Sequence, residues 1–485
     1  MNYKMMGRFN SLILTVEAVF MVPALLISLF CGDRAGVNGF VVAILTAMAI
    51  AGALALLSRG ARPDFFAKEG LVCVGLSWIV MSLVGSLPFY VSGYIPSFID
   101  ALFETVSGFT TTGASILSDV TALSKGMLYW RSFSHWLGGM GVLVFLLAII
   151  PVSGKSEGYT MHILRAESPG PDVGKLVPKM RQTAAILYSV YVVLTVLDFV
   201  FLIAGKMPLF DAVCTAFGTA GTGGFGIRAD SISSYSPYLQ TVTAVFMLLF
   251  GINFSCYYLI LLRQVRSVLK DEEIRLYIGV VVATVLLITA NIYKMYSGVG
   301  EALRHSFFQV SSIITTTGFA TTDFNNWPEF SKALLLMLMI VGACAGSTGG
   351  GMKCARVLLI FKTIRRNIGQ VLQPKRVRVI RVNGKMVDEK LVASTNAYLA
   401  VYIVIILASF ILVSLDGLSM TANVSAVISC MNNIGPGFAE IGPMFSYGAY
   451  GTLSKCVLIF DMLAGRLEIF PILVLFNRHA WKRQG

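Results

Sequence analysis

Long apolar runs are the feature that most restricts how this chain of 485 residues can fold. A helix needs about 20 mostly apolar residues to cross the hydrocarbon core of a bilayer. Charged residues make up 13% of the chain, whereas soluble proteins contain about 25%. We therefore expect an all-α, polytopic membrane protein. The expected spans are 11–30, 37–57, 69–94, 134–151, 183–204, 237–262, 274–292, 331–362, 395–416 and 452–476.

Four shorter and less apolar segments lie between these runs. Each is too short to cross a bilayer, so we expect it to enter the membrane and return on the same side. Such a path is possible only where the backbone is buried in protein or lines a water-filled cavity. The four segments are 98–110, 210–218, 302–314 and 420–431.

The distribution of Lys and Arg supports this number of spans. With the N-terminus in the cytoplasm, 28 of the 38 basic residues fall in segments expected inside and nine in segments expected outside. An excess of Lys and Arg in cytoplasmic segments is the positive-inside rule. We therefore expect both termini in the cytoplasm. The basic residues behind the net charge of +13 lie between apolar runs. They therefore indicate orientation in the membrane and contact with membrane lipids, and we expect no binding of nucleic acid.

The order of span, short helix, loop and span occurs four times after the first two spans. We therefore expect two extra N-terminal helices in residues 1–60 and then four helix–pore-loop–helix repeats. The expected repeats, with their pore loops in parentheses, are 61–152 (98–115), 153–270 (210–226), 271–390 (302–320) and 391–485 (420–438).

A glycine-bearing tract ends or follows each short segment, and the four tracts are residues 110–114, 219–225, 315–319 and 432–437. Glycine adopts positive φ at little steric cost, and rings of backbone carbonyls can then replace the water shell of a dehydrated cation. In the second tract either Gly223 or Gly224 can be the equivalent glycine, and the following Phe225 favours Gly224. The alternative is that these tracts are only turns. The predicted ion-binding residues are Thr111, Thr112, Gly113, Thr222, Gly223, Gly224, Thr316, Thr317, Gly318, Asn433, Ile434 and Gly435.

A second cluster of glycines interrupts the expected span 331–362. Residues 342–351 contain five glycines, and each costs about 1 kcal/mol in a helix relative to alanine. We predict a flexible loop that blocks the ion path when closed. Close packing of helices through small residues is the alternative. The predicted gate residues are Gly346, Ser347, Thr348, Gly349, Gly350, Gly351 and Arg466.

Arg466 lies within the last expected span. Charges at this depth are costly and usually face a partner or a water-filled cavity. We predict a pore-facing positive charge, and a structural ion pair with Asp461 or Glu468 is the alternative. Asp198 is another acid expected within the membrane, and the sequence indicates no partner for it. Asn253 and Lys353 are weaker candidates for residues that face the pore.

The sequence resembles the TrkH branch of the Trk/Ktr/HKT superfamily of potassium transporters over nearly its whole length. The similar stretches are FTTTGA at 109–114, TTTGF at 315–319, NNIGPG at 432–437, CAGSTGGGMK at 344–353 and GRLEIF at 465–470. The resemblance implies fourfold pseudosymmetry, a K⁺-channel-like fold, and one filter glycine in each repeat. Serine at the first of these positions goes with Na⁺ preference in the superfamily, so Gly113 favours K⁺.

The resemblance also implies a function and partners. These are potassium uptake across the inner (plasma) membrane, a homodimer, and a cytosolic nucleotide-binding regulatory subunit that is TrkA-like. The basic segment 353–390 is a candidate docking surface, although it can equally serve orientation and lipid contact. We expect no enzyme activity and no cofactor bound by this chain, with K⁺ as the transported ion. A symporter coupled to H⁺ or Na⁺ is the alternative function.

Overall fold

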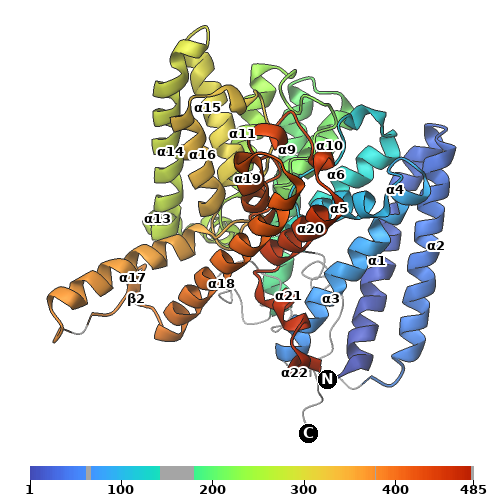
Figure 1. Ribbon diagram of the computed structural model, residues 1–485, viewed down its shortest axis with the longest axis horizontal. Helices are drawn as coiled ribbons and strands as arrows, with labels where there is room; N and C mark the ends of the chain where they lie inside the picture. Colours follow the sequence, from blue (N-terminus) through green and yellow to red (C-terminus); the bar gives the residue numbers. More distant parts are fainter. Residues whose placement is uncertain (62–66, 142–179, 377, 482–485) are drawn as a thin grey trace.

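The computed structural model describes residues 1–61, 67–141, 180–376 and 378–481, and these segments are mostly helical (Figure 1). Six of their helices are long and apolar enough to cross a membrane. A seventh candidate is the pair α11 (Pro237–Phe250) and α12 (Phe254–Leu261), which are bent by 89° relative to each other. The described chain therefore has the composition of a multi-pass membrane protein, as its apolar runs predict.

Helices α1 (Tyr3–Phe30) and α2 (Arg34–Leu57) lie side by side at one edge of the molecule (Figure 1). The buried face of α2 repeats small residues every four positions, at Gly39, Ala43, Ala47 and Ala51. Small residues let two helix backbones approach closely. The Ser11 hydroxyl uses this proximity and donates a hydrogen bond to the carbonyl of Ala51 at 2.7 Å.

The remaining elements follow along the chain in four groups. The first group is α3 (Ala67–Gly85), α4 (Leu87–Val91), α5 (Phe98–Phe109) and α6 (Lys125–Gly139). The second is α9 (Met180–Ala204), α10 (Leu209–Gly221), α11, α12 and α13 (Val265–Lys270). The third is α14 (Glu272–Ile292), α15 (Val299–Ile314), α16 (Glu329–Val341), α17 (Cys354–Leu372), β1 (Arg381–Val382) and β2 (Lys385–Met386). The fourth is α18 (Glu389–Val413), α19 (Met420–Met431), α20 (Thr452–Arg466), α21 (Phe470–Leu475) and α22 (Arg478–Trp481).

Each of the four short segments forms a separate helix, namely α5, α10, α15 and α19. Serine caps two of them, because Ser97 accepts a hydrogen bond from the Asp100 amide and Ser419 accepts one from the Ala422 amide. Such caps satisfy backbone amides that have no partner inside the first turn. The four helices match the expected segments to within a few residues.

Three expected spans differ from the structure. Helix α6 begins at Lys125, ahead of the expected span 134–151, because Ser124 caps it. Residues 142–151 of that span lie outside the described part of the chain. The expected span 237–262 is broken at residues 251–253, where Asn253 accepts a hydrogen bond from the Ser255 amide and starts α12. The expected span 452–476 is broken after Arg466.

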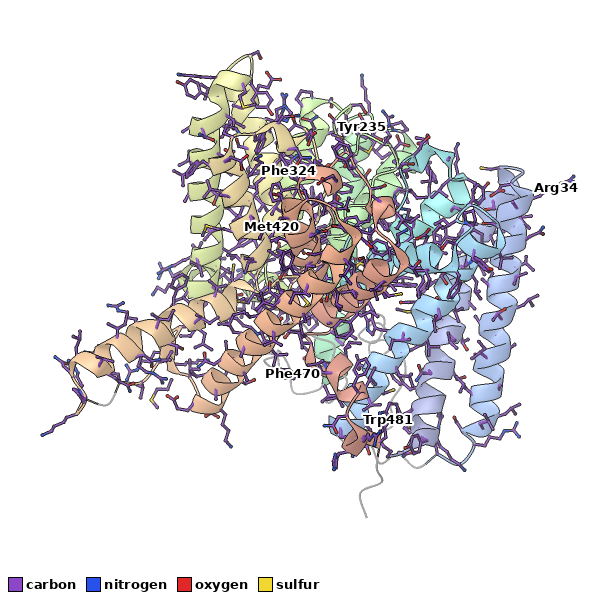
Figure 2. All side chains as sticks on the ribbon, in the orientation of Figure 1. Arg34, Tyr235, Phe324, Met420, Phe470 and Trp481 are labelled. Atoms are coloured by element: carbon purple, nitrogen blue, oxygen red, sulfur yellow. The ribbon has the colours of Figure 1, made fainter. Side chains whose placement is uncertain are left out.

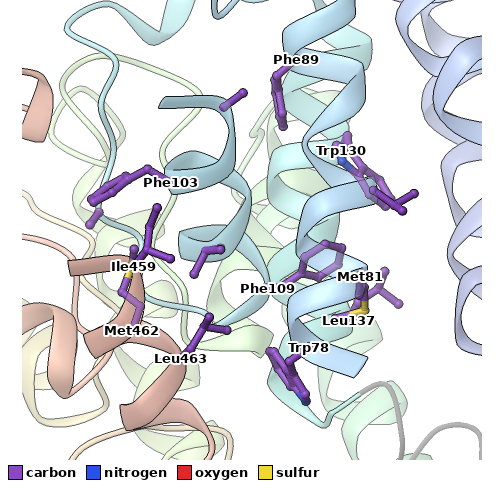
Figure 3. Packing of buried hydrophobic residues seen from close by; sticks show 14 of the residues in the cluster. Trp78, Met81, Phe89, Phe103, Phe109, Trp130, Leu137, Ile459, Met462 and Leu463 are labelled. Carbon is purple, nitrogen blue, oxygen red and sulfur yellow. The ribbon is translucent and has the colours of Figure 1, made fainter. Parts of the chain in front are cut away.

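The buried apolar side chains between α3, α5, α6 and α20 form the core around the first short helix. Figure 3 shows Phe109 of α5 facing Trp130 and Leu137 of α6. The rings of Phe109 and Trp130 meet edge to face at 5.9 Å, a favoured arrangement for aromatic pairs. The Trp130 indole also donates to the Gly85 carbonyl at 3.1 Å. This packing fixes the end of α5.

An arm formed by α17, the hairpin of β1 and β2, and the beginning of α18 projects from the main body (Figure 1). The arm carries basic side chains and exposed apolar ones on α17, including Phe361, Ile364 and Ile368. Elsewhere α1 meets the last described helix, α22, because the Tyr3 hydroxyl donates to the Trp481 carbonyl at 2.6 Å. Figure 2 shows Trp481 at the end of the molecule away from Arg34.

Candidate functional site

The four glycine-bearing tracts share one backbone conformation. Each has a positive φ at the glycine and another positive φ at the residue two positions before it. The glycine angles are 79° at Gly113, 67° at Gly224, 87° at Gly318 and 102° at Gly435. The preceding angles are 56° at Thr111, 54° at Thr222, 58° at Thr316 and 55° at Asn433. This register makes Gly224, and not Gly223, equivalent to the other three glycines.

The same hydrogen bond closes the C-terminal end of each short helix. In every tract the amide just before the glycine donates to the carbonyl five residues earlier, a pattern that commonly ends helices. The pairs, donor first, are Thr112 with Ser107, Gly223 with Gly218, Thr317 with Ser312, and Ile434 with Ser429, at 2.8–3.0 Å. The partial negative charge of a helix C-terminus is therefore directed at each tract.

The four tracts lie against one another in a closed ring. A methyl group added to any of the four glycines would collide with a backbone carbonyl oxygen of a neighbouring tract. The pairs, glycine first, are Gly113 with Gly223, Gly224 with Thr317, Gly318 with Ile434, and Gly435 with Thr112. In each case the carbonyl belongs to the residue just before the next glycine. The ring therefore has the same contact at all four of its junctions.

A cavity of about 210 Å³ opens beyond the ring, and all four glycines contribute to its lining. The rest of the lining comes mainly from residues that follow the glycines, such as Ser115, Phe225 and Tyr447. The Tyr447 hydroxyl donates to the carbonyl of Gly435 at 2.7 Å. Sequence reasoning missed Tyr447, which lies twelve residues beyond its partner.

Side chains behind the ring join the tracts to the helices. In the first tract the hydroxyls of Thr110 and Thr112 lie 2.7 Å apart. The side-chain amide of Asn433 in the fourth tract donates to the Thr112 hydroxyl at 3.0 Å and to the Met462 carbonyl at 2.9 Å. The predicted residues Thr112 and Asn433 thus hold two neighbouring tracts together.

A buried ion pair lies behind the first tract and was not predicted. Glu104 of α5 and Arg131 of α6 are 2.5 Å apart, and both are almost fully buried. The same carboxylate accepts hydrogen bonds from the Ser115 hydroxyl at 3.0 Å and from the Ile116 amide at 3.0 Å. Glutamate and arginine within otherwise apolar segments were the signal that could have identified this pair.

The glycine-rich loop, residues 342–353, lies directly beneath the third and fourth tracts. The Gly350 amide donates to the Thr316 hydroxyl at 2.6 Å. A methyl group on Gly350 would collide with the carbonyl of Asn432, and one on Gly349 would lie 2.9 Å from the carbonyl of Thr315. Two of the predicted gate residues, Gly349 and Gly350, are therefore in contact with the tracts.

The break between α11 and α12 holds the other side of this loop. The Cys344 amide donates to the Gly251 carbonyl at 3.1 Å, and the Phe254 amide donates to the Gly346 carbonyl at 3.0 Å. Glu273 of α14 accepts hydrogen bonds from the amides of Ala345 at 2.6 Å and Ala355 at 3.0 Å. Sequence reasoning did not identify Glu273, whereas Asn253 at the break was a weaker candidate.

Arg466 connects the glycine-rich loop to the end of α6. Its guanidinium donates to the Thr348 carbonyl at 2.9 Å and to the carbonyls of Gly138 and Gly139. The two acids proposed as its alternative partners have other contacts. Glu468 pairs with Arg356, and Asp461 accepts a hydrogen bond from Ser409 at 2.7 Å.

Two further predicted positions have different surroundings. Lys353 is buried, and its ammonium group donates to the carbonyl of Gly349 within the glycine-rich loop. Asp198 is buried in α9 and lies near Thr219 of α10. Lys353 therefore lies with the other loop residues, whereas Asp198 lies behind the second short helix.

Comparison with known proteins gives a consistent family. The family model described as TrkH, cation transport protein, matches residues 38–482. The Trk system potassium uptake protein TrkH of Salmonella typhimurium is 33% identical over 488 residues, which cover 99% of this chain and 100% of that protein. The Trk system potassium uptake protein TrkG of Escherichia coli is 30% identical over 468 residues, which cover 95% of each chain.

The solved structures include one of similar fold. The crystal structure of the potassium transporter TrkH from Vibrio parahaemolyticus matches with a TM-score of 0.88 and 31% identity, over 99% of this chain and 100% of that one. The match therefore extends to the arrangement of the helices. From its sequence, its fold and its relatives, the chain belongs to the TrkH family of cation transport proteins.

Proposed function

We propose that this chain takes up K⁺ across the cell membrane through a pore whose selectivity filter is the ring of four glycine-bearing tracts. The closed ring carries the proposal, because each glycine lies against the carbonyl that precedes the next glycine. The relatives are named as potassium uptake proteins, which agrees with a K⁺ pathway.

The chemistry of the ring suits a dehydrated cation. A cation that leaves water needs oxygen atoms at fixed positions, and backbone carbonyls supply them without a net charge. The short helices direct four partially negative C-terminal ends at the ring, which favours cations over anions. Gly113 adds no side chain to the first tract, and we propose that this favours K⁺ over Na⁺.

The glycine-rich loop is the proposed gate. It lies under the ring, touches the third and fourth tracts, and is connected through Arg466 to the end of α6 below the first tract. In this position it blocks the path on one side of the ring. Its glycines at 342, 346 and 351 adopt positive φ, which other residues rarely do.

The proposed setting is the inner (plasma) membrane, with both chain ends in the cytoplasm. The hydrogen bond between Tyr3 and Trp481 supports ends on one side. The proposed assembly is a homodimer, and its candidate contact is α17, which lies in the projecting arm (Figure 1) and exposes Phe361, Ile364 and Ile368. The basic residues of the arm are the proposed contact with a TrkA-like nucleotide-binding regulatory subunit.

The test is growth of a bacterium that lacks its own K⁺ uptake systems on low potassium. Expression of this chain is expected to restore growth. Gly224→Val is expected to abolish it, because the added side chain collides with the Thr317 carbonyl. Gly279→Val is the matched control, since no atom lies within 4 Å of the position of a methyl group at Gly279. Equal growth with both variants would contradict the filter.

A symporter coupled to H⁺ or Na⁺ is the second candidate. The buried acids Glu17, Asp198 and Asp461 favour it, because intramembrane acids often take part in proton relays. Single-channel current steps in a planar bilayer would support the pore. A K⁺ flux that requires a fixed ratio of H⁺ or Na⁺ would support coupling.

A further inference from the structure

The second tract lacks the pair of threonines that stabilises the first and third tracts. In the first tract the hydroxyls of Thr110 and Thr112 lie 2.7 Å apart, and in the third those of Thr315 and Thr317 lie 2.8 Å apart. These positions are three residues and one residue before the glycine. In the second tract they are Gly221 and Gly223, so both the packing and the hydrogen bond of the threonines are missing.

His135 of α6 occupies the space that these two glycines leave. A methyl group on Gly223 would collide with the imidazole ring, and one on Gly221 would collide with the His135 carbonyl. The histidine is fully buried. It comes from the first helix–loop–helix segment, so a neighbouring segment fills the place of the missing side chains.

The two ring nitrogens of His135 connect the end of α5 with the second tract. Nδ1 lies 2.8 Å from the Gly108 carbonyl near the end of α5, and Nε2 lies 3.2 Å from the Phe225 amide. A carbonyl can only accept and an amide can only donate, so Nδ1 carries the proton and Nε2 accepts. The ring also packs on Phe225, with a distance of 4.2 Å between ring centroids.

Arg131, one helical turn before His135, extends the same connection. Its guanidinium lies 3.6 Å from the centre of the Phe225 ring and donates to the Gly226 carbonyl at 2.8 Å. Its ion pair with Glu104 continues to the first tract. A continuous chain of buried polar contacts therefore runs from the first tract to the residues that follow Gly224.

We propose that His135 is a positioning residue for K⁺ selectivity, which replaces the threonine pair of the first and third tracts and fixes the carbonyls of the second tract. The inference rests on the proposed function. A binding site works only when its ligands are held within about 0.5 Å of their productive positions by locked surrounding residues. His135 is the buried contact that meets Gly221, Gly223 and Phe225 together.

The first test compares His135→Gln with His135→Leu in purified protein reconstituted into liposomes. Glutamine keeps a donor and an acceptor, whereas leucine has a similar size and keeps neither. We expect K⁺ flux to persist in both, with the ratio of K⁺ to Na⁺ permeability near wild type for glutamine. For leucine we expect a loss of about tenfold, the effect of about 1.4 kcal/mol. A wild-type ratio in His135→Leu would overturn the inference, whereas no K⁺ flux from the wild-type chain would refute the proposed function instead.

The second test uses the close contact between Gly223 and His135. It tests the role of His135 even if His135→Leu does not reach the membrane. Gly223→Thr alone is expected to abolish K⁺ flux, because its side chain collides with the imidazole ring. Combining it with His135→Ala removes the ring and is expected to restore part of the K⁺ flux and selectivity. If the K⁺ flux and selectivity of the double variant are no higher than those of Gly223→Thr, His135 does not replace the threonine pair.

Discussion

At the scale of single residues, the ring depends on backbone angles that its residues do not prefer. Thr111, Thr222, Thr316 and Asn433 all have φ between 54° and 58°. Positive φ is unusual for a residue that is not glycine, above all for β-branched threonine. Such angles persist only where the surroundings determine them fully, and they cluster at functional sites. In this protein the hydrogen bonds behind the tracts hold these backbone angles in place.

The ion pair of Glu104 and Arg131 is expected to be important for stability. Glu104→Ala leaves a buried guanidinium without its carboxylate, so the free energy of unfolding should fall by about 3–5 kcal/mol. The midpoint of thermal unfolding in detergent measures this change. Glu329→Ala is the matched control, because Glu329 pairs with Lys332 on the surface and such pairs contribute only about 0–1 kcal/mol. Equal midpoints for the two variants would contradict this role.

Arg466 is expected to hold the glycine-rich loop closed. Arg466→Ala removes hydrogen bonds to Thr348, Gly138 and Gly139, and a bond to a charged group contributes about 1.5–3 kcal/mol. The K⁺ flux into liposomes without a regulatory subunit should therefore rise more than about tenfold. Arg466→Lys keeps the charge but not the planar fork, so an intermediate flux is expected. Wild-type conductance and gating in Arg466→Ala would exclude this role.

At the scale of elements, the sequence predicts those helices and breaks that follow from the length and composition of a segment. The four short helices and the interruption of span 331–362 are in the structure, because a short apolar segment and a cluster of glycines each leave a clear pattern. The break between α11 and α12 was not predicted, because both sides are equally apolar and only Gly251 and Asn253 mark it. The start of α6 was missed because its polar residues are buried against partners elsewhere.

The contacts that brace the ring were also beyond prediction from sequence. The tracts themselves repeat a visible motif, so their positions could be predicted. Arg131 contacts Glu104 and Gly226, which lie 27 and 95 residues away in the sequence. Only the fold brings such residues together. The following Phe225 favours Gly224 over Gly223 in the sequence, and the positive φ angles of Thr222 and Gly224 agree with this choice.

The glycine-rich loop gives a prediction for a whole element. Deletion of residues 345–351 removes the segment that lies beneath the third and fourth tracts, so K⁺ flux into liposomes should rise and no longer respond to a regulatory subunit. An internal deletion of the same length in the hairpin arm, residues 380–386, is the control and should leave the unregulated flux unchanged. Unchanged flux after deletion of 345–351 would show that the loop does not block the path.

At the scale of the whole molecule, four separate parts of the chain contribute one tract each to a single ring. The α1–α2 pair lies at one edge and the arm projects at another (Figure 1), so neither takes part in the ring. The central claim is that the carbonyls of this ring bind a dehydrated cation and that glycine at position 113 sets the preference for K⁺.

The most direct measurement compares K⁺ and Na⁺ fluxes through the reconstituted wild-type chain and its Gly113→Ser variant. The Cβ of a serine at 113 would collide with the carbonyl of Gly223, so this carbonyl must shift and the spacing of the ring changes. The account predicts a strong preference for K⁺ in the wild-type chain and a much weaker one, with Na⁺ flux gained, in Gly113→Ser. Identical K⁺-to-Na⁺ ratios for the two proteins would contradict it.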